Sequence, residues 1–182
     1  MVVHPSRRVR YWCQDETRLG LKTIQRRKIT AKGVKPMGQV QWQRQAFYLY
    51  GIVEPKSGES FFYEFSHLDG ACFELFLNLV SQQFPDSLNI IQLDNASAHT
   101  AKPIQIPANI LLVFQPPHSP ELNPIERLWQ HLKSKLAWNL YDQLDQLREG
   151  LAQQLQQLQP LMIASLTGWD YILDALSVAG IY

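Results

Sequence analysis

Cysteine is nearly absent from this sequence, which has only Cys13 and Cys72 in its 182 residues. Two isolated cysteines exclude a disulfide framework and a metal site built from several thiolates. No apolar run approaches the roughly 18 residues that a membrane-spanning helix needs, so we expect no membrane partner. The first ten residues lack the apolar segment of a secretory signal. We therefore expect a protein of the reducing cytoplasm.

Acidic residues are scarce in the first quarter of the chain. Residues 1–44 contain eleven of the seventeen Lys and Arg and only two acids, Asp15 and Glu16. The formal charge is therefore +9 in this segment and −8 in the remainder, although the whole chain carries only +1. A basic segment on a nearly neutral protein indicates a polyanionic partner at one face. The alternative is a solvated loop that happens to be basic.

The first half of the chain has the pattern of an antiparallel meander. An aromatic run at 10–16 predicts a first strand, and 17–44 predicts an irregular basic connection that contains a turn. Residues 45–55 are aromatic and β-branched and end at a proline, which predicts a second strand. Residues 59–66 predict a third strand, which forms a hairpin with the second.

The second half alternates between helices and strands. Apolar residues at helical spacing predict a helix over 69–84, and the compact apolar runs at 88–94 and 108–117 predict buried strands. Residues 119–138 predict a helix, and leucines spaced by three and four from Leu140 to Leu158 predict another, ended by Pro160. A last helix is expected over about 161–177. A meander followed by β-α-β units predicts an α/β domain with a mixed five-stranded sheet flanked by helices.

Three carboxylates end or begin predicted elements. Asp94 closes a buried strand, where side chains leave the packed core and sites are built, although Asp at a strand end also forms simple turns. Glu126 lies in "NPIE", where Asn123 fits an N-cap and Glu126 could complete a capping box. Glu126 also lies at the edge of an apolar helix face. Asp15 and Glu16 end the first strand, and alternation allows only one of them to face a shared site.

Converging carboxylates repel one another unless divalent cations neutralise them. Mg²⁺ prefers oxygen ligands and binds through one or two carboxylates together with substrate phosphates. Two such ions can hold both the attacking and the leaving oxygen of a phosphodiester. The residue types therefore favour a metal-dependent reaction on a nucleic acid.

The blocks "QDETRLGLK", "LDNASAHTAK" and "QPPHSPELNPIERLWQHLK" resemble the three signature blocks of mariner-like transposases of the bacterial insertion-sequence-630 family. The resemblance covers essentially the whole chain. It implies a single RNase H-like domain over 1–182, with C-terminal helices at about 140–177. It also implies a catalytic triad of Asp15, Asp94 and Glu126 that binds two Mg²⁺ or Mn²⁺ ions, and so selects Asp15 over Glu16.

The resemblance also implies partners. The substrates would be double-stranded DNA, namely the transposon ends and a target cut at TA dinucleotides. The protein would be located in the bacterial cytoplasm, associated with the nucleoid. The family's N-terminal helix-turn-helix modules are expected to be absent, because the chain begins almost at the first catalytic strand. We expect a homodimer or a partner that supplies this region. The predicted DNA-contacting residues are Arg26, Arg27, Lys28, Lys32, Lys35, His99 and His118.

Two smaller expectations concern single residues. His99 could contact a phosphate, with a local turn hydrogen bond as the alternative. Trp129 is expected in the core rather than as a platform for base stacking. Two other functions stay open, namely a catalytically silent DNA-binding or regulatory remnant of a transposase, and a general RNase H-like nuclease that acts on RNA–DNA hybrids.

Overall fold

A computed structural model of the chain describes residues 8–27, 29–35, 37–95, 104–117 and 119–181. Across these ranges one five-stranded sheet forms, in the order β3-β2-β1-β4-β5. β1 pairs antiparallel with β2, and β2 with β3, whereas β4 pairs parallel with both β1 and β5. The predicted mixed sheet is therefore confirmed. Its strands are β1 (Arg8–Gly20), β2 (Ala46–Val53), β3 (Ser60–Phe65), β4 (Ser87–Leu93) and β5 (Ile110–Phe114).

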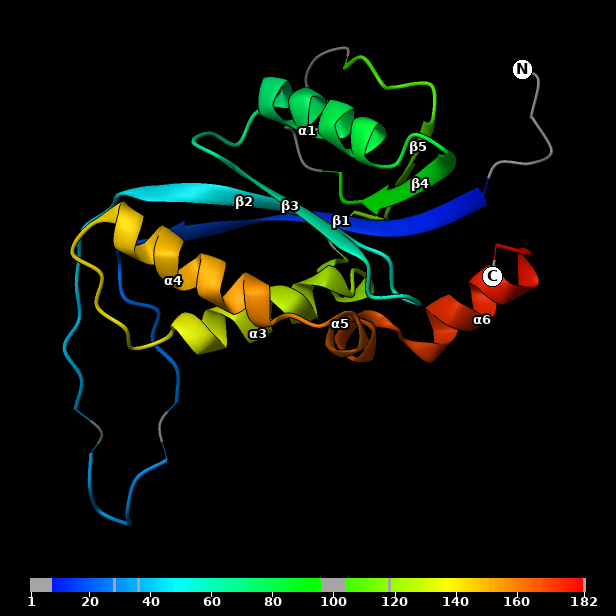
Figure 1. The fold of residues 1–182 in the computed structure, drawn as a ribbon. Coiled ribbons are helices and arrows are strands. Elements are labelled where there is room, and N and C mark those ends of the chain that lie inside the picture. Colours follow the sequence, from blue (N-terminus) through cyan, green and yellow to red (C-terminus); the bar gives the residue numbers. More distant parts are fainter. Residues whose placement is uncertain (1–7, 28, 36, 96–103, 118, 182) are drawn as a thin grey trace.

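The central strand β1 is buried on both faces, because helices cover the sheet from either side (Figure 1). Successive side chains of a strand point to opposite faces. Trp12 accordingly packs with the helix on one side, and Cys13 and Leu19 pack with the helices on the other. Each face has its own hydrophobic core.

Helix α1 (Gly70–Gln83) covers the first face. It buries Phe73, Phe76, Leu77 and Val80 at the spacing of one helical stripe, as the sequence predicts. Its N-terminus is capped by Asp69, whose Oδ1 accepts a hydrogen bond from the backbone N–H of Cys72 at 2.9 Å.

Three helices cover the opposite face: α3 (Ile125–Leu136), α4 (Leu144–Gln157) and α5 (Pro160–Thr167) (Figure 1). α3 contacts β1 directly and lies between the sheet, α4 and α5. It buries Ile125, Leu128, Trp129, Leu132 and Leu136. This stripe brings the first turn of α3 against the middle of the sheet.

The C-terminal third differs from the expected helices in its boundaries. The predicted last helix over 161–177 is wrong as a single element, because α5 and α6 (Asp170–Val178) meet at a bend of 92°. Gly168 is the C-cap of α5 at this bend, and an added Cβ there would lie 2.7 Å from the carbonyl oxygen of Ala164 and 2.9 Å from that of Pro55, so the position has no room for a side chain. Pro160 begins α5 rather than only ending α4, since proline suits the first helical position.

The segment before α3 is also more irregular than predicted. A short 3₁₀ turn, Pro120–Leu122, precedes α3, and the leucine-spaced helix begins at Leu144 rather than at Leu140. Within the described ranges, no single helix is long and apolar enough to cross a membrane, and only the bent pair α5–α6 meets that test when its two helices are joined.

The turn between β2 and β3 touches the start of α5. Gly58 has a φ of +72°, and an added Cβ would overlap the carbonyl oxygen of Pro160. Gly180 has a similar φ of +68° but has nothing within 4 Å of the added Cβ. Replacing Gly180 therefore introduces backbone strain alone, whereas replacing Gly58 introduces the same strain together with a clash against α5.

We predict that Gly180→Ala lowers the free energy of unfolding by about 1 kcal/mol, the approximate cost of a left-handed L-residue. Gly58→Ala should lower it by at least about twice as much, because strain and steric overlap combine. Urea denaturation of both variants measures the difference. Equal losses would show that the β2–β3 turn does not support α5.

Candidate functional site

Asp15 lies in the middle of β1, directly opposite Gly51 of β2. Its half-buried side chain points to the face that α3 covers, since the indole Nε1 of Trp129 donates a hydrogen bond to Asp15 Oδ2 at 2.9 Å. Cys13 and Leu19, which share its alternation, belong to the core on that side. Asp15 is therefore a carboxylate set beneath α3.

Glu16 points to the other face of the sheet. Its Oε1 accepts a hydrogen bond from Gln14 Nε2 at 2.8 Å, and Glu16 helps to raise the pKa of Tyr50 after the larger effect of burial. Tyr50 belongs to the core beneath α1. The choice that alternation left open is thus settled in space, and Asp15 is the one of the two acids on the α3 face.

Asp94 follows the last residue of β4, on the strand next to Asp15. β1 and β4 run parallel, with Cys13 opposite Gln92. Asp15 and Asp94 have the same separation in sequence as that pair, so continuing the register puts them side by side. Gln92 lies on the α3 side, because its Nε2 donates to the carbonyl oxygen of Leu122 at 3.1 Å. Alternation carried two residues further assigns the exposed Asp94 to the same side.

Glu126 is half-buried in the first turn of α3. Two side-chain hydrogen bonds attach the preceding turn to the central strands. Asn123 Nδ2 donates to the backbone oxygen of Gln14 at 2.7 Å, and the bond from Gln92 to Leu122 ties the same turn to β4. Glu126 is thereby held above the strand that carries Asp15.

The capping-box alternative for Glu126 is wrong. The N-cap position of α3 is Pro124, and no side-chain hydrogen bond caps the helix. Asn123 cannot serve as the cap because its amide is directed to β1. A carboxylate in the first turn still gains from the positive end of the helix dipole, but it does not close a cap.

The electrostatics of Asp15 reflect this crowding. Its pKa is raised well above the ordinary value, chiefly because burial disfavours the charged form, and then because Glu16 and Glu126 repel it. Hydrogen bonds from the backbone N–H of Glu16 and from Trp129 act in the opposite direction. The repulsion between Asp15 and Glu126 means that α3 and β1 bring the two carboxylates into the same neighbourhood, although 110 other residues separate them in sequence.

The donor set suits a hard cation. Asp15, Asp94 and Glu126 offer only carboxylate oxygens, which Mg²⁺ and Mn²⁺ prefer, and a cation would relieve the repulsion on Asp15. As they stand in the described ranges, no three His, Cys, Asp or Glu side chains are close enough to hold a metal ion. The residues therefore fit such an ion in their chemistry, while their side chains lie too far apart to hold one together.

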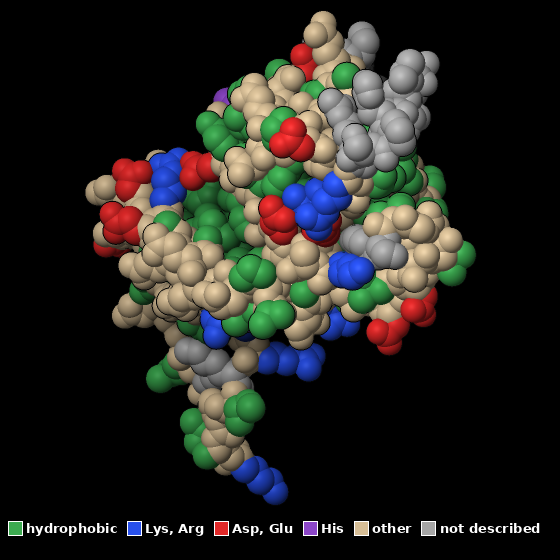
Figure 2. All heavy atoms as spheres, turned by 45° about the vertical axis from the view of Figure 1, so that its right-hand side comes forward, with side chains coloured by type: hydrophobic (Ala, Val, Ile, Leu, Met, Phe, Trp, Pro, Cys, Tyr) green, Lys and Arg blue, Asp and Glu red, His purple; other side chains and the backbone are tan. Residues whose placement is uncertain are grey.

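The predicted DNA-contacting cations lie on a separate feature, the basic arm, which we define as residues 21–45. It contains seven Lys or Arg and no acid. It projects away from the sheet between β1 and β2, and Lys and Arg side chains gather where it leaves the body and at its tip (Figures 1 and 2). Four of the predicted residues are described, and all four are exposed: Arg26, Arg27, Lys32 and Lys35.

The base of the basic arm is fixed to α3 and to the residues just after it. Arg26 donates to the backbone oxygen of Gln130 at 3.2 Å, and Trp138 Nε1 donates to the backbone oxygen of Arg26 at 3.2 Å. The backbone N–H of Trp138 also donates to the oxygen of Ile24 at 3.1 Å. The same helix therefore carries Glu126 at its start and supports the basic arm from its middle.

Three of the predicted residues, Lys28, His99 and His118, lie outside the described residues. Asn95, which follows Asp94, donates through Nδ2 to the backbone oxygen of Gln115 at 2.8 Å, so it ties β4 to the segment after β5. Cys13 is buried, and burial raises its pKa strongly, which agrees with an unreactive core thiol.

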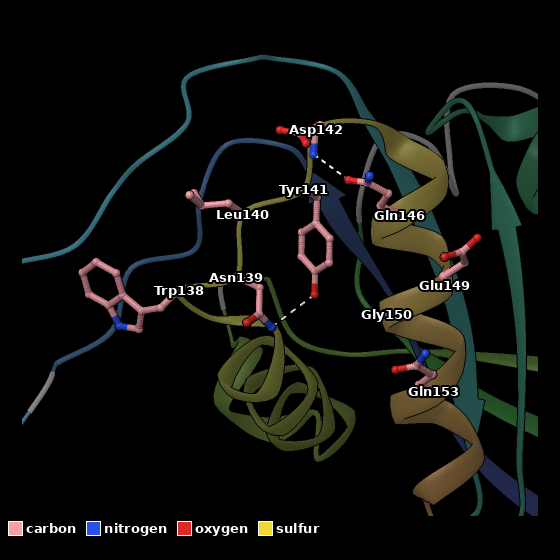
Figure 3. A pocket seen from close by; sticks show the side chains of 9 residues that line it. All are labelled: Trp138, Asn139, Leu140, Tyr141, Asp142, Gln146, Glu149, Gly150 and Gln153. Atoms are coloured by element: carbon pink, nitrogen blue, oxygen red, sulfur yellow. Dashed lines mark hydrogen bonds between the residues drawn. The ribbon is translucent and has the colours of Figure 1, made fainter.

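An open pocket lies away from the carboxylates, between the α3–α4 connection and α4 (Figure 3). Its lining includes Tyr141, whose hydroxyl accepts a hydrogen bond from Asn139 at 3.2 Å, and Gln146, which accepts one from the backbone N–H of Asp142. No residue of the carboxylate site lines it.

Sequence reasoning missed several residues that hold the site. Trp129 was assigned only to the core, yet its indole contacts Asp15. No motif indicates the contacts that Gly51, Asn123 and Gln92 make with the other elements. For Trp129, Asn123 and Gln92 the available signal was a polar side-chain group at a buried position, because a buried amide or indole N–H requires a partner.

The comparisons with known proteins agree with this geometry. A protein of Sinorhizobium fredii (strain NBRC 101917 / NGR234), named only as uncharacterized protein y4pE/y4sA, is 32% identical over 93 residues, which is 50% of this chain and 69% of that protein. It belongs to the same sequence group but brings no function with it.

Among solved structures, the fold matches the Mos1 transposase paired-end complex with the left transposon end at a TM-score of 0.68 and 16% identity. The match covers 90% of this chain and 52% of that one. The Mos1 mariner paired end complex with Mn gives a TM-score of 0.67 at 16% identity, over 87% and 51%. The complex with Mg gives 0.61 at 15% identity, over 94% and 55%. This chain thus spans about half the length of these relatives, and the likeness confirms the RNase H-like fold.

Residues 10–148 match the family described as DDE superfamily endonuclease. The matched span begins in β1, ends in α4 and includes all three carboxylates. It covers well over half of the chain, and it agrees with the family resemblance predicted from the three sequence blocks. The chain belongs to the DDE superfamily endonucleases.

Proposed function

We propose that this chain is the catalytic domain of a mariner-like transposase, which cuts and joins double-stranded DNA using divalent cations held by Asp15, Asp94 and Glu126. The observation that carries the proposal is that the three acids share one region of the α3 face. Glu126 of α3 helps to raise the pKa of the half-buried Asp15, and continuing the β1–β4 register puts Asp94 beside Asp15. Membership of the DDE endonuclease family and the fold of Mos1 support it.

The proposed cofactors are two Mg²⁺ or Mn²⁺ ions. The Mos1 complexes named with Mn and with Mg support the choice of a divalent cation. When bound, such ions lower the pKa of an attacking water and neutralise charge that develops on the phosphodiester. Asp15 and Asp94 would hold them from the sheet, and Glu126 from α3.

The proposed reaction is hydrolysis at a transposon end, followed by strand transfer. In hydrolysis a water oxygen forms a bond to phosphorus, and the bond from phosphorus to the 3′ oxygen breaks, which frees a 3′-hydroxyl. In strand transfer this hydroxyl attacks a phosphodiester of the target, and a target 3′ oxygen leaves. The chain's own contribution is to hold the three carboxylates in place and to keep the DNA backbone near them.

We assign the second task to the basic arm. Its cations are exposed, and its base is attached to the helix that carries Glu126. Lys and Arg side chains that contact phosphates provide affinity without reading bases. The basic arm therefore suits a duplex of any sequence.

Asp15 generates a prediction about pH and metal. For an acid whose folded pKa lies above its unfolded value, the folded state holds the proton more tightly, so stability falls as the pH rises between the two values. Asp15 should thus lower the stability of the metal-free chain progressively as the pH rises above about 4, the pKa of an unfolded Asp. Asp15→Asn should remove that loss and be the more stable protein at neutral pH.

Urea unfolding of both proteins in EDTA between pH 4 and pH 8 measures this difference. Mn²⁺ should raise the melting temperature of the wild type, and this rise should be small in Asp15→Asn and in Asp94→Asn. A Mn²⁺-dependent rise of the same size in all three proteins would place the metal elsewhere.

Glu126 generates a prediction about activity. Glu126→Gln should reduce metal-dependent nicking of duplex DNA at least about 100-fold, because a neutral amide cannot replace a charged metal ligand. The free energy of unfolding should change by less than about 0.5 kcal/mol, since no cap is lost. The exposed Glu121 of the preceding turn gives a matched control, and Glu121→Gln should nick like the wild type.

The nicking assay should include an RNA–DNA hybrid of the same sequence. Cleavage of the duplex DNA with little cleavage of the hybrid supports the transposase. Preference for the hybrid would favour the RNase H-like nuclease, and a well-folded Glu126→Gln variant that nicks normally would reject the assignment of Glu126.

The basic arm generates a prediction about salt. The logarithm of DNA affinity should fall steeply with the logarithm of salt concentration, about equally for unrelated sequences. Removing two phosphate-contacting cations with Arg27→Ala and Lys35→Ala should lower this slope by about two units. Arg148→Ala is the control, because Arg148 lies outside the basic arm and forms ion pairs with Glu64 of β3 and Asp145 of α4. An unchanged slope in the double variant would make the basic arm a solvated loop.

A further inference from the structure

Trp129 is the largest side chain of α3 and is only 1% exposed. It packs in the core beneath α3, with its ring centroid 5.9 Å from that of Phe62 of β3. Its single polar atom, Nε1, donates to Asp15 Oδ2 at 2.9 Å. A buried indole N–H normally finds a partner, and here that partner is a carboxylate of the proposed metal site.

Gly51 makes this contact possible. It lies opposite Asp15 on β2 and shares the face of Phe47, Leu49 and Val53, all of which are buried in the core beneath α3. An added Cβ at Gly51 would lie 2.6 Å from Trp129 Cη2 and 2.8 Å from Phe62 Cδ1. The ring of Trp129 therefore occupies the space that a side chain on β2 would fill.

We propose that Trp129 is a positioning residue for Asp15, and that Gly51 is the vacancy on β2 that lets its indole reach that carboxylate. The proposal rests on the proposed function, in which Asp15 holds a divalent cation. The hydrogen bond fixes one carboxylate oxygen of Asp15, so that the side chain is oriented for the metal before the metal binds. Partners of this kind typically change metal affinity 10- to 100-fold.

Trp12, on the same strand as Asp15, offers a matched control. Trp12 is fully buried in the other core, and its Nε1 donates to Asn89 Oδ1, also at 2.9 Å. Trp12→Phe and Trp129→Phe both remove one buried indole N–H and leave an aromatic ring. Only Trp129→Phe removes a hydrogen bond to a carboxylate of the site.

The experiment is a titration with Mn²⁺ in which free Mn²⁺ is measured by electron paramagnetic resonance, so that no activity is needed. Trp129→Phe should weaken Mn²⁺ binding about 10-fold or more, whereas Trp12→Phe should bind within about 2-fold of the wild type. Circular dichroism and the melting temperature check that each variant is folded. Asp15→Asn is included as the reference for loss of the site.

Gly51→Ala tests the same contact from the β2 side, because it displaces the indole and leaves its N–H intact. It should weaken Mn²⁺ binding as Trp129→Phe does, and the double variant should be little weaker than either single variant, since both remove one interaction. If Gly51→Ala fails to fold, the comparison of Trp129→Phe with Trp12→Phe still decides the proposal.

Wild-type affinity in Trp129→Phe, or equal weakening in Trp129→Phe and Trp12→Phe, would overturn the positioning role and leave the proposed function standing. Wild-type affinity in Asp15→Asn would instead overturn the metal site itself. The two failures are therefore distinguishable.

Discussion

The carboxylate of Asp15, set in the middle of the sheet beneath a helix, is the constraint on which the site depends. Burial and two neighbouring acids disfavour its charge, and only a few groups favour it: the backbone N–H of Glu16, the indole of Trp129 and the proposed cation. The apolar stripe that packs α3 on the sheet also brings the indole of Trp129 to Asp15. The absence of a side chain at Gly51 leaves room for that ring.

The turn before α3 is hydrogen-bonded to both central strands of the sheet. Asn123 binds the backbone of β1 one residue before Asp15, and Gln92 of β4 binds the same turn two residues before Asp94. The two central strands and the start of α3 are therefore linked by side chains adjacent to the three acids. The middle of α3 holds the base of the basic arm through Gln130, and Trp138 holds it just beyond the end of the helix. A single helix thus connects the proposed metal site with the proposed DNA contacts.

Much of this architecture could be predicted from the sequence, because hydrophobic periodicity and strand ends are local signals. The positions of the strands, α1 and α3 follow from such patterns, and Asp94 and Glu126 from their places at element ends. Asp15 was expected at the end of the first strand but lies in the middle of β1. The run at 108–117 was expected to form a buried strand, but β5 is a mostly exposed edge strand, because no further strand in the described part of the chain covers that side. Alternation could not choose between Asp15 and Glu16, since both faces of β1 are buried. The contacts of Trp129 and Asn123 could not be predicted, because each joins residues more than 100 positions apart. The bend at Gly168 was missed because the apolar spacing continues across it.

The measurement that tests the central claim most directly is anomalous diffraction from Mn²⁺ in crystals of the chain bound to duplex DNA. The account predicts Mn²⁺ peaks about 2.0–2.3 Å from carboxylate oxygens of Asp15, Asp94 and Glu126, with a DNA phosphate completing the coordination. The same crystals of Asp15→Asn should show these peaks weakened or absent. Mn²⁺ bound at other acids, with the three carboxylates left apart, would contradict the account.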